Sequence, residues 1–168
     1  MKRIIPVFIL CTLLFFACDN DDEKMEYAKI YFPLATRADQ NGIFLASFDY
    51  AKDTTFIIGA YCAGSILPTQ DVRVAIGLAE DSLLNAQQHN VAVAGYNLLP
   101  AEAYEVLPAD TVTTIKKGTE RGDIKVKFHT SVLDPGKQYI LPLYIKSASH
   151  YEIAAKYNYL FFGIKRQQ

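Results

Sequence analysis

The chain has 168 residues, of which 51% are hydrophobic and 21% are charged, and its formal net charge is -1. This composition excludes an intrinsically disordered chain, and the length favours a single domain that is stable without a metal ion, a cofactor or disulfides. The balanced charge excludes a nucleic-acid partner that is held by a basic surface.

The N-terminus has the features of a secretion signal. Met1-Lys2-Arg3 carries positive charge, and the uncharged run Ile4–Phe16 follows it. At about 1.5 Å per residue this run is about 20 Å long, which is short of the hydrocarbon core of a membrane at about 30 Å. We therefore predict a signal peptide over residues 1–17 rather than a membrane-spanning helix.

The leader ends in a cysteine that follows a small residue, in the sequence Leu14-Phe15-Phe16-Ala17-Cys18. This arrangement resembles the lipobox of bacterial lipoproteins, although the family prefers a leucine and a small residue where this chain has Phe15 and Phe16. The resemblance implies cleavage before Cys18 and acylation of Cys18. Two or more acyl chains give a durable anchor, so we expect the chain to be fastened in outer-membrane lipid.

An acidic stretch, Asp19-Asn20-Asp21-Asp22-Glu23-Lys24, follows the cysteine directly. It is similar to the export signal that sends Bacteroidetes lipoproteins to the outer face of the outer membrane. A solvated acidic tether over residues 18–26 without an export role has the same composition. The expected location is the outer membrane, with the protein lipid-anchored and facing the extracellular side.

The sequence of the remaining residues, 27–168, predicts one domain built of short strands. Apolar and polar residues alternate in Val72–Leu78 and in Asp123–Phe128, so these two strands have one solvent-exposed face each. The predicted strands are Ala28–Pro33, Ile43–Phe48, Thr55–Cys62, Val72–Leu78, Tyr104–Leu107, Val112–Lys116, Asp123–Phe128, Gln138–Lys146 and Tyr157–Lys165. The turn signals between them are Asn41-Gly42, Lys117-Gly118, Arg121-Gly122 and Asp134-Pro135-Gly136.

One segment predicts a helix, and the others together predict the fold class. Glu80–Gln88 places Leu83 and Leu84 among polar residues, which favours a short surface helix. Pro142 inside the strand Gln138–Lys146 indicates an edge position or a bulge. The many short strands predict an all-β antiparallel sandwich with Greek-key connections, and an up-and-down barrel is the alternative.

A series of short motifs occurs in a fixed order along the domain: Val72–Leu78, Tyr96-Asn97, Leu98–Pro100, Tyr104–Pro108, Ile115–Gly118, Ile124–Val126 and Tyr139–Pro142. This order resembles the domain of unknown function common in Bacteroidetes surface lipoproteins and found N-terminal to GH18-type endo-N-acetylglucosaminidase modules. The resemblance covers about residues 28–165. It implies an immunoglobulin-like β-sandwich in a glycan-utilisation or adhesion system, without catalytic residues, and we expect no hydrolase module in this protein.

The sequence contains no motif for catalysis or metal binding. The histidines lie far apart and lack metal-ligand spacing: His89, His129 and His150. Four carboxylates fall in loops or at strand ends, where only the fold can pair them for glycoside chemistry: Asp81, Asp110, Glu120 and Asp123. Cys62 is predicted to be a small buried hydrophobic residue in a strand. We therefore expect a protein that is not an enzyme, with neither a catalytic nor a metal site.

Aromatic residues supply the candidate binding site, since the chain has 11 Tyr, 10 Phe and no Trp. Exposed tyrosines stack on sugar rings or anchor protein interfaces, because they combine an apolar body with a polar tip. The candidates are Tyr151, Tyr157 and Tyr159 near the C-terminal strand, where Tyr157 and Tyr159 share a face at a period of two. Tyr96 and Tyr104 flank the Leu98–Pro100 segment, and most of the aromatic side chains of the chain are expected to serve packing.

Three classes of function remain open. The first is a non-catalytic surface lipoprotein that serves as an accessory glycan-binding or adhesion module in polysaccharide utilisation. The second is an assembly or adhesion subunit that binds a surface protein through a sheet edge or an apolar patch and binds no sugar. A hydrolase, which requires convergent carboxylates in a cleft, is the least favoured.

Overall fold

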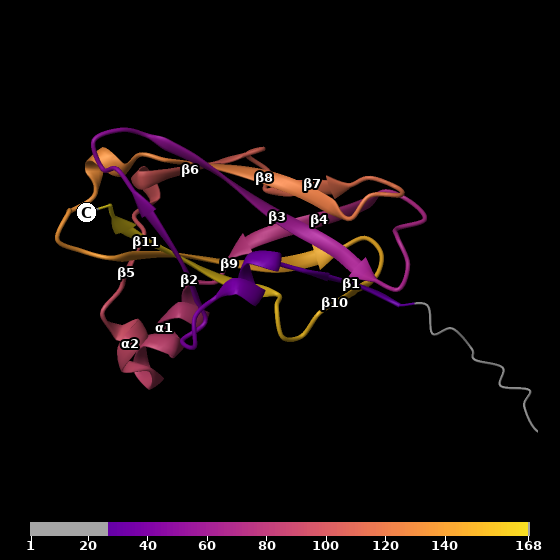
Figure 1. Cartoon of the computed structure of the whole chain (residues 1–168), viewed down its shortest axis with the longest axis horizontal. Coiled ribbons are helices and arrows are strands. Elements are labelled where there is room, and N and C mark those ends of the chain that lie inside the picture. The colour runs from indigo at the N-terminus through magenta and orange to yellow at the C-terminus, as the bar shows by residue number, and fades with distance from the viewer. Residues whose placement is uncertain (1–26, 168) are drawn as a thin grey trace, which may run out of the picture.

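Two β-sheets lie face to face in the computed structural model, which describes residues 27–167 (Figure 1). Sheet A has the strand order β10 (Glu152–Ile153), β1 (Ala28–Tyr31), β3 (Thr54–Gly64), β8 (Arg121–Phe128) and β6 (Tyr104–Leu107). Sheet B has the order β2 (Ile43–Phe48), β11 (Tyr159–Arg166), β9 (Tyr139–Ala148), β4 (Val72–Leu78) and β7 (Val112–Ile115). The short strand β5 (Asn97–Leu98) pairs with β9 beside them.

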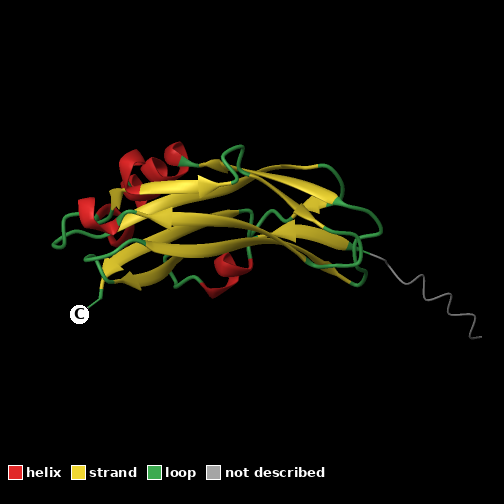
Figure 2. Cartoon of the chain, turned by 90° about the horizontal axis from the view of Figure 1, so that it is seen from above, coloured by secondary structure: helices red, strands yellow, loops and turns green. Residues whose placement is uncertain are grey.

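The strands run along the length of the molecule in two layers (Figure 2). Each sheet has free edges, so the fold is a sandwich and not the alternative closed barrel. The predicted all-β class is confirmed. Most neighbouring strands are antiparallel, while three pairings that involve short or edge strands are parallel: β1 with β10, β2 with β11 and β5 with β9.

Alternation along β8 shows why the sequence forms a two-layered fold. Ile124, Val126 and Phe128 are buried, whereas the alternate residues Asp123 and Lys125 are exposed. A pleated strand points successive side chains to opposite faces, so this pattern places one face against the other sheet and the other face in solvent. The outer face of β8 is therefore available to a ligand.

Aromatic rings fill one part of the main core between the sheets. The ring of Phe162 on β11 lies 4.8 Å from that of Phe56 on β3 and 5.5 Å from that of Phe128 on β8. Phe48 on β2 lies 5.2 Å from Phe128, measured between ring centroids. Each buried Phe side chain contributes about 1.5–3 kcal/mol of hydrophobic stabilisation, so this cluster holds the two sheets together.

Two helices cover part of the outer face of sheet B (Figure 1). The helix α1 (Glu80–His89) confirms the predicted one, and the short α2 (Val91–Ala94) follows it. A second apolar cluster lies beneath them and consists of Ile43, Leu83, Val93 and Ile140. No helix within residues 27–167 has the length and apolar content needed to cross a membrane. The predicted signal peptide, Cys18 and the whole acidic tether over residues 18–26 lie outside the described residues.

The structure corrects the prediction for Pro142, which lies in the interior of sheet B. It pairs with Phe161 of β11, and its carbonyl oxygen accepts a hydrogen bond of 3.0 Å from the N–H of Ala79 on the other side. In a strand the nitrogen and the carbonyl of one residue point to the same side. On that side β5 pairs with β9 only as far as Ile140, and β4 pairs with it only from Leu143. Pro142 lies between these two pairings, so the N–H that proline lacks is not needed there.

The predicted turn at Arg121-Gly122 is also wrong, because both residues belong to β8, where Gly122 pairs with Ala60 and Arg121 with Tyr61. Gly122 allows β7 to pack closely against β8. A Cβ atom at Gly122 would lie 2.9 Å from Oγ1 of Thr113 and 3.0 Å from the nitrogen of Ile115, because β7 passes close by.

Candidate functional site

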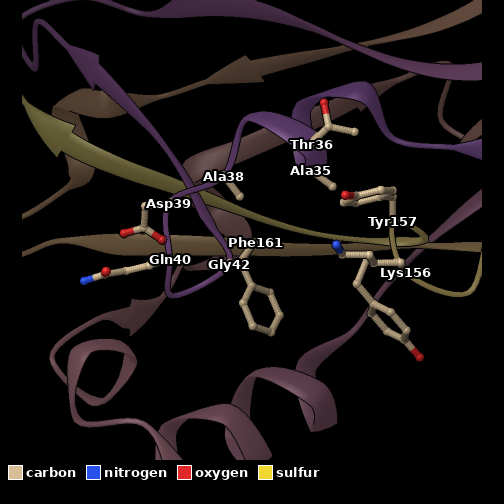
Figure 3. A pocket seen from close by; sticks show the side chains of 10 residues that line it. Ala35, Thr36, Ala38, Asp39, Gln40, Gly42, Lys156, Tyr157 and Phe161 are labelled. Carbon is tan, nitrogen blue, oxygen red and sulfur yellow. The ribbon is translucent and has the colours of Figure 1, made fainter.

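The candidate site is a groove at the side of the sandwich, between the segment before β2 and the segment that leads into β11 (Figure 3). Its volume is about 440 Å³. Figure 3 shows Asp39 and Gln40 on one side of the groove and Lys156 and Tyr157 on the opposite side, with Phe161 between them. The 3-10 helix η1 (Pro33–Arg37) contributes Ala35 and Thr36 to its upper wall.

Tyr157 and Tyr159, two of the three predicted ligand-binding tyrosines, both line this groove. Tyr157 lies just before β11 and not within a strand, and its carbonyl oxygen accepts a 2.9 Å hydrogen bond from the N–H of Phe32. Tyr159 is the first residue of β11, and its side chain is 44% exposed. The hydrogen bond to Phe32 fixes the backbone beneath Tyr157, so the two rings are held at the same opening.

Asp39 supplies an ionised carboxylate at the opposite wall. Its Oδ1 accepts hydrogen bonds from the N–H groups of Asn41 at 2.8 Å and Ile43 at 3.0 Å. Partial desolvation favours the neutral form, but the hydrogen bonds from Ile43 and Asn41 together lower the pKa of Asp39. The carboxylate therefore stays charged near neutral pH, and it makes the turn before β2 rigid.

Lys156 supplies a cation on the tyrosine side. Its Nζ lies 5.1 Å from the ring centroid of Tyr157, within the range of a cation–π contact. The groove thus combines apolar ring surface with a carboxylate, an amide and an ammonium group. Such a lining suits a ligand that presents both an apolar face and hydroxyl groups, because rings contact the first and the polar groups hydrogen-bond the second.

A second depression continues on the other side of Tyr159. Its volume is about 410 Å³, and Tyr144, Glu80, Asp81 and Ser82 line it together with Tyr159. Tyr144 of β9 and Tyr159 of β11 are directly opposed in register, and their rings lie 5.9 Å apart at 19° to each other. Tyr159 therefore lines both the groove and the second depression, while Tyr144 lines only the second depression.

The third predicted tyrosine, Tyr151, lies apart from this groove. Its hydroxyl accepts a 3.0 Å hydrogen bond from the N–H of Thr69, and its ring packs against the main core. Tyr96 packs against the cluster beneath the helices, and Tyr104 packs against the main core. Burial, chiefly through desolvation, raises the pKa of Tyr96 and of Tyr104.

The histidines occupy three separate places. Nδ1 of His89 lies 2.8 Å from the carbonyl oxygen of Asn85 in α1, and Nδ1 of His129 lies 2.9 Å from Oδ2 of Asp53. His150 contacts its neighbour Ser149. Within residues 27–167, no three His, Cys, Asp or Glu side chains form a group that could hold a metal ion.

The four candidate carboxylates lie on different segments. Asp81 is in the first turn of α1, Asp110 caps the N–H of Val112, and Glu120 lies in the loop before β8. Asp123 in β8 forms an ion pair with Arg121. Only Asp81 of these four lines the second depression.

Cys62 lies in β3 and is fully buried, which confirms the prediction for this residue. Desolvation raises the pKa of its thiol, so it is protonated at neutral pH. A buried, protonated thiol is a poor nucleophile, and Cys62 serves packing.

Sequence reasoning missed Asp39, Gln40, Tyr144 and Lys156 as site residues. Asp39 precedes the turn signal Asn41-Gly42, which is a local hint of an ordered loop. Tyr144 faces Tyr159 only through the pairing of β9 with β11, and no local pattern indicates that register.

Solved structures with the same fold come from Bacteroides. A putative carbohydrate binding protein from Bacteroides ovatus ATCC 8483 superposes with a TM-score of 0.62 at 20% identity, over 83% of this chain and 37% of that chain. A multidomain protein including DUF1735 from Bacteroides ovatus gives 0.65 at 16% identity, over 84% and 46%. EndoBT-3987 from Bacteroides thetaiotamicron, solved with Man5GlcNAc product, gives 0.56 at 12% identity, over 83% and 31%.

These likenesses show the fold, and this chain spans less than half the length of each of the three proteins. No curated protein is a significant match to the sequence. Residues 24–152, more than half of the chain, match a family model that carries the description "-like, N-terminal domain". Together with the DUF1735 protein and EndoBT-3987, this match confirms the resemblance carried by the motif order, and the chain belongs to this family of N-terminal domains.

Proposed function

We propose that the protein is a non-catalytic accessory module that binds glycans at the cell surface through the groove between Asp39 and Tyr157. The observation that carries the proposal is the convergence of Tyr157 and Tyr159 on an opening that also contains polar side chains. A pyranose ring has an apolar face that packs on tyrosine and hydroxyl groups that pair with Asp39, Gln40 and Lys156.

The structural neighbours support the same class of ligand. One of them is a putative carbohydrate binding protein, and another was solved with a Man5GlcNAc product. The matching domain forms only 37% and 31% of those two chains. What they support is a setting in which this fold accompanies glycan recognition or processing.

The carboxylates support a binding role rather than hydrolysis. A glycosidase generally needs one carboxylic acid whose pKa is raised, facing a second carboxylate at a set distance. The described carboxylates with shifted pKa values are all shifted downward: Asp39, Asp49, Asp53 and Asp71. Asp39, the carboxylate within the groove, is already engaged by backbone N–H groups.

A glycan array that covers host and plant polysaccharides tests the binding role. We expect the protein to bind at least one neutral glycan and the Tyr159→Ala variant to bind it about tenfold more weakly, since exposed tyrosines are frequent binding hot spots. Tyr27→Ala is the matched control, because Tyr27 is exposed and does not line the groove. Silence of the unmodified protein on the whole array contradicts the proposal.

A second candidate function is binding of a surface protein. Leu78 and Leu98 are 43% and 42% exposed, and both line a small pocket of about 160 Å³ next to Tyr104. Exposed apolar side chains that lie together favour a protein partner. A silent array combined with weaker assembly of a Leu78→Ser, Leu98→Ser variant into its surface complex favours this second function.

The proposed location is the outer membrane, with the protein anchored through acylated Cys18 and facing the extracellular side. The first described residues, at the start of β1, lie at the end of the sandwich opposite the C-terminus (Figure 1). We expect metabolic labelling with palmitate to tag the protein and Cys18→Ala to remove the tag. An untagged protein found in the cytosolic fraction contradicts both the anchor and the surface role.

A further inference from the structure

A row of aromatic and charged side chains crosses the outer face of sheet A. The ring of Tyr61 lies 6.3 Å from that of Tyr31, and Tyr31 lies 6.5 Å from Tyr157, measured between ring centroids. At one end Lys156 lies over the ring of Tyr157, and at the other end the guanidinium of Arg121 lies 5.8 Å from the ring centroid of Tyr61. All three rings are partly exposed.

Strand register produces this line. Tyr31 of β1 is directly opposite Tyr61 of β3, and Tyr61 is directly opposite Arg121 of β8. Directly opposed residues point to the same face of a sheet and lie side by side across the strands. The hydrogen bond from Phe32 to the carbonyl of Tyr157 attaches the last ring to the same row. The line therefore runs across the strands, and it meets the groove at Tyr157.

Gly59 leaves room for the side chains at the charged end of the row. A Cβ atom at this position would lie 3.0 Å from Oδ1 of Asp123, 3.1 Å from Cε1 of Tyr61 and 3.3 Å from Nε of Arg121. The side chains of Tyr61, Arg121 and Asp123 thus close over a residue that has none. A larger residue at position 59 would push these three groups away from the sheet.

We propose that this row is a second carbohydrate-binding surface, on which a neutral oligosaccharide lies across the strands and continues from the groove at Tyr157. The inference rests on the proposed function and extends it to the length and class of the ligand. Successive sugar rings contact Tyr157, Tyr31 and Tyr61, while hydroxyl groups pair with Lys156 at one end and with Arg121 and Asp123 at the other.

The pairing of Arg121 determines the class of sugar. Its guanidinium is bound to the carboxylate of Asp123, and this ion pair raises the pKa of Arg121 despite some desolvation. The pair offers both donors and acceptors, which match hydroxyl groups. An acidic sugar would have to displace Asp123 from Arg121 before it could bind at this end of the row, so the Arg121 end favours neutral sugars over uronates.

Isothermal titration calorimetry with di-, tetra- and hexasaccharides of mannose, of glucose and of galactose tests the proposal on the purified protein. We expect one hexasaccharide to bind about tenfold more tightly than its disaccharide, and Tyr61→Thr to remove this gain. Threonine keeps the strand propensity but removes the ring. Tyr31→Thr is a second, independent variant on the neighbouring strand, and Tyr27→Thr is the control; thermal unfolding checks that each variant is folded.

The outcomes separate this inference from the proposed function. If the disaccharide binds but the hexasaccharide gains nothing, or if folded Tyr61→Thr and Tyr31→Thr keep the gain, the row is not a binding surface and the groove remains. If the array shows a glycan ligand but none of these oligosaccharides binds, the proposal for the row is overturned and the groove remains, whereas silence on the array as well overturns both proposals. Hexagalacturonate tests the class: we expect it to bind only after Asp123→Asn releases Arg121, and preferential binding by the unmodified protein overturns the assignment to neutral sugars.

Discussion

Ionised aspartates hold several loops of this protein. Oδ2 of Asp71 lies 2.8 Å from Nζ of Lys116, and its Oδ1 accepts a 2.9 Å hydrogen bond from the N–H of Lys117. These two contacts, the ion pair first, lower the pKa of Asp71. Asp49 and Asp53 also have lowered pKa values, through the N–H of Ala51 and through His129 respectively as the largest causes.

The Asp71 contacts predict how stability depends on pH. The pKa of Asp71 in the folded state lies below that in the unfolded chain, so the unfolded state binds protons first as the pH falls. Its stabilising effect is present above the unfolded pKa of about 4 and is lost as the pH falls through the folded pKa. We expect Asp71→Asn to lower the melting temperature at pH 7 and to make little difference at pH 2.

Thermal unfolding by circular dichroism at these two pH values measures the effect. Glu120→Gln is the control, since it neutralises an exposed carboxylate in the loop between β7 and β8, which also contains Lys116 and Lys117. An equal loss of melting temperature for Asp71→Asn at both pH values would show that the substitution acts through packing instead of through charge.

At the scale of the elements, β1 depends on its contact with the far end of β3. Ala28 is directly opposite Gly64, and the N–H of Ser65 donates a 2.8 Å hydrogen bond to the carbonyl of Tyr27. A Cβ atom at Gly64 would lie 2.0 Å from that carbonyl oxygen and 2.8 Å from Cα of Ala28. Both neighbours are backbone atoms, so no side-chain movement can relieve the clash.

Gly64→Ala is therefore expected to detach β1 from β3 and to lower the free energy of unfolding by about 1–3 kcal/mol. Gly95→Ala is the matched control, because nothing lies within 4 Å of a Cβ atom there and its φ of -76° suits any residue. Chemical denaturation measures both variants. If Gly64→Ala unfolds like Gly95→Ala, the close approach of the two strands contributes nothing to stability.

Across the whole molecule, the phenylalanine cluster joins the two sheets. Phe162 contacts rings from both sheets and is fully buried, and its ring is nearly parallel to that of Phe128, at 10°. We expect Phe162→Ala to lower the free energy of unfolding by about 3–5 kcal/mol, since it removes a large side chain and leaves a cavity. Urea denaturation measures this loss.

Leu84→Ala is the comparison for Phe162, because Leu84 is 57% exposed on α1. Surface substitutions of this kind change stability by about 0.5 kcal/mol or less. Similar losses for the two variants would mean that the aromatic cluster does not join the sheets.

Local patterns were sufficient to predict most strands and the helix. The bounds predicted for β2, β4 and β6 agree with the structure, and α1 differs by one residue at its end. Alternation and turn residues act over a few positions, so the sequence shows them directly. The same reasoning missed α2, β5 and β10, which have four, two and two residues and are too short to show a period.

By itself the sequence determined the all-β sandwich, the burial of Cys62, the helix that begins at Glu80, and the choice of Tyr157 and Tyr159 as candidate ligand-binding residues. Only the tertiary structure decided that Pro142 is central, that Arg121 lies in a strand, and that Tyr31 and Tyr61 join Tyr157 in one row. The physical reason is that the alternation of residues along a strand decides on which face of the sheet a side chain lies, and the local sequence shows this alternation. Its partners depend on strand register, which packing between distant segments sets.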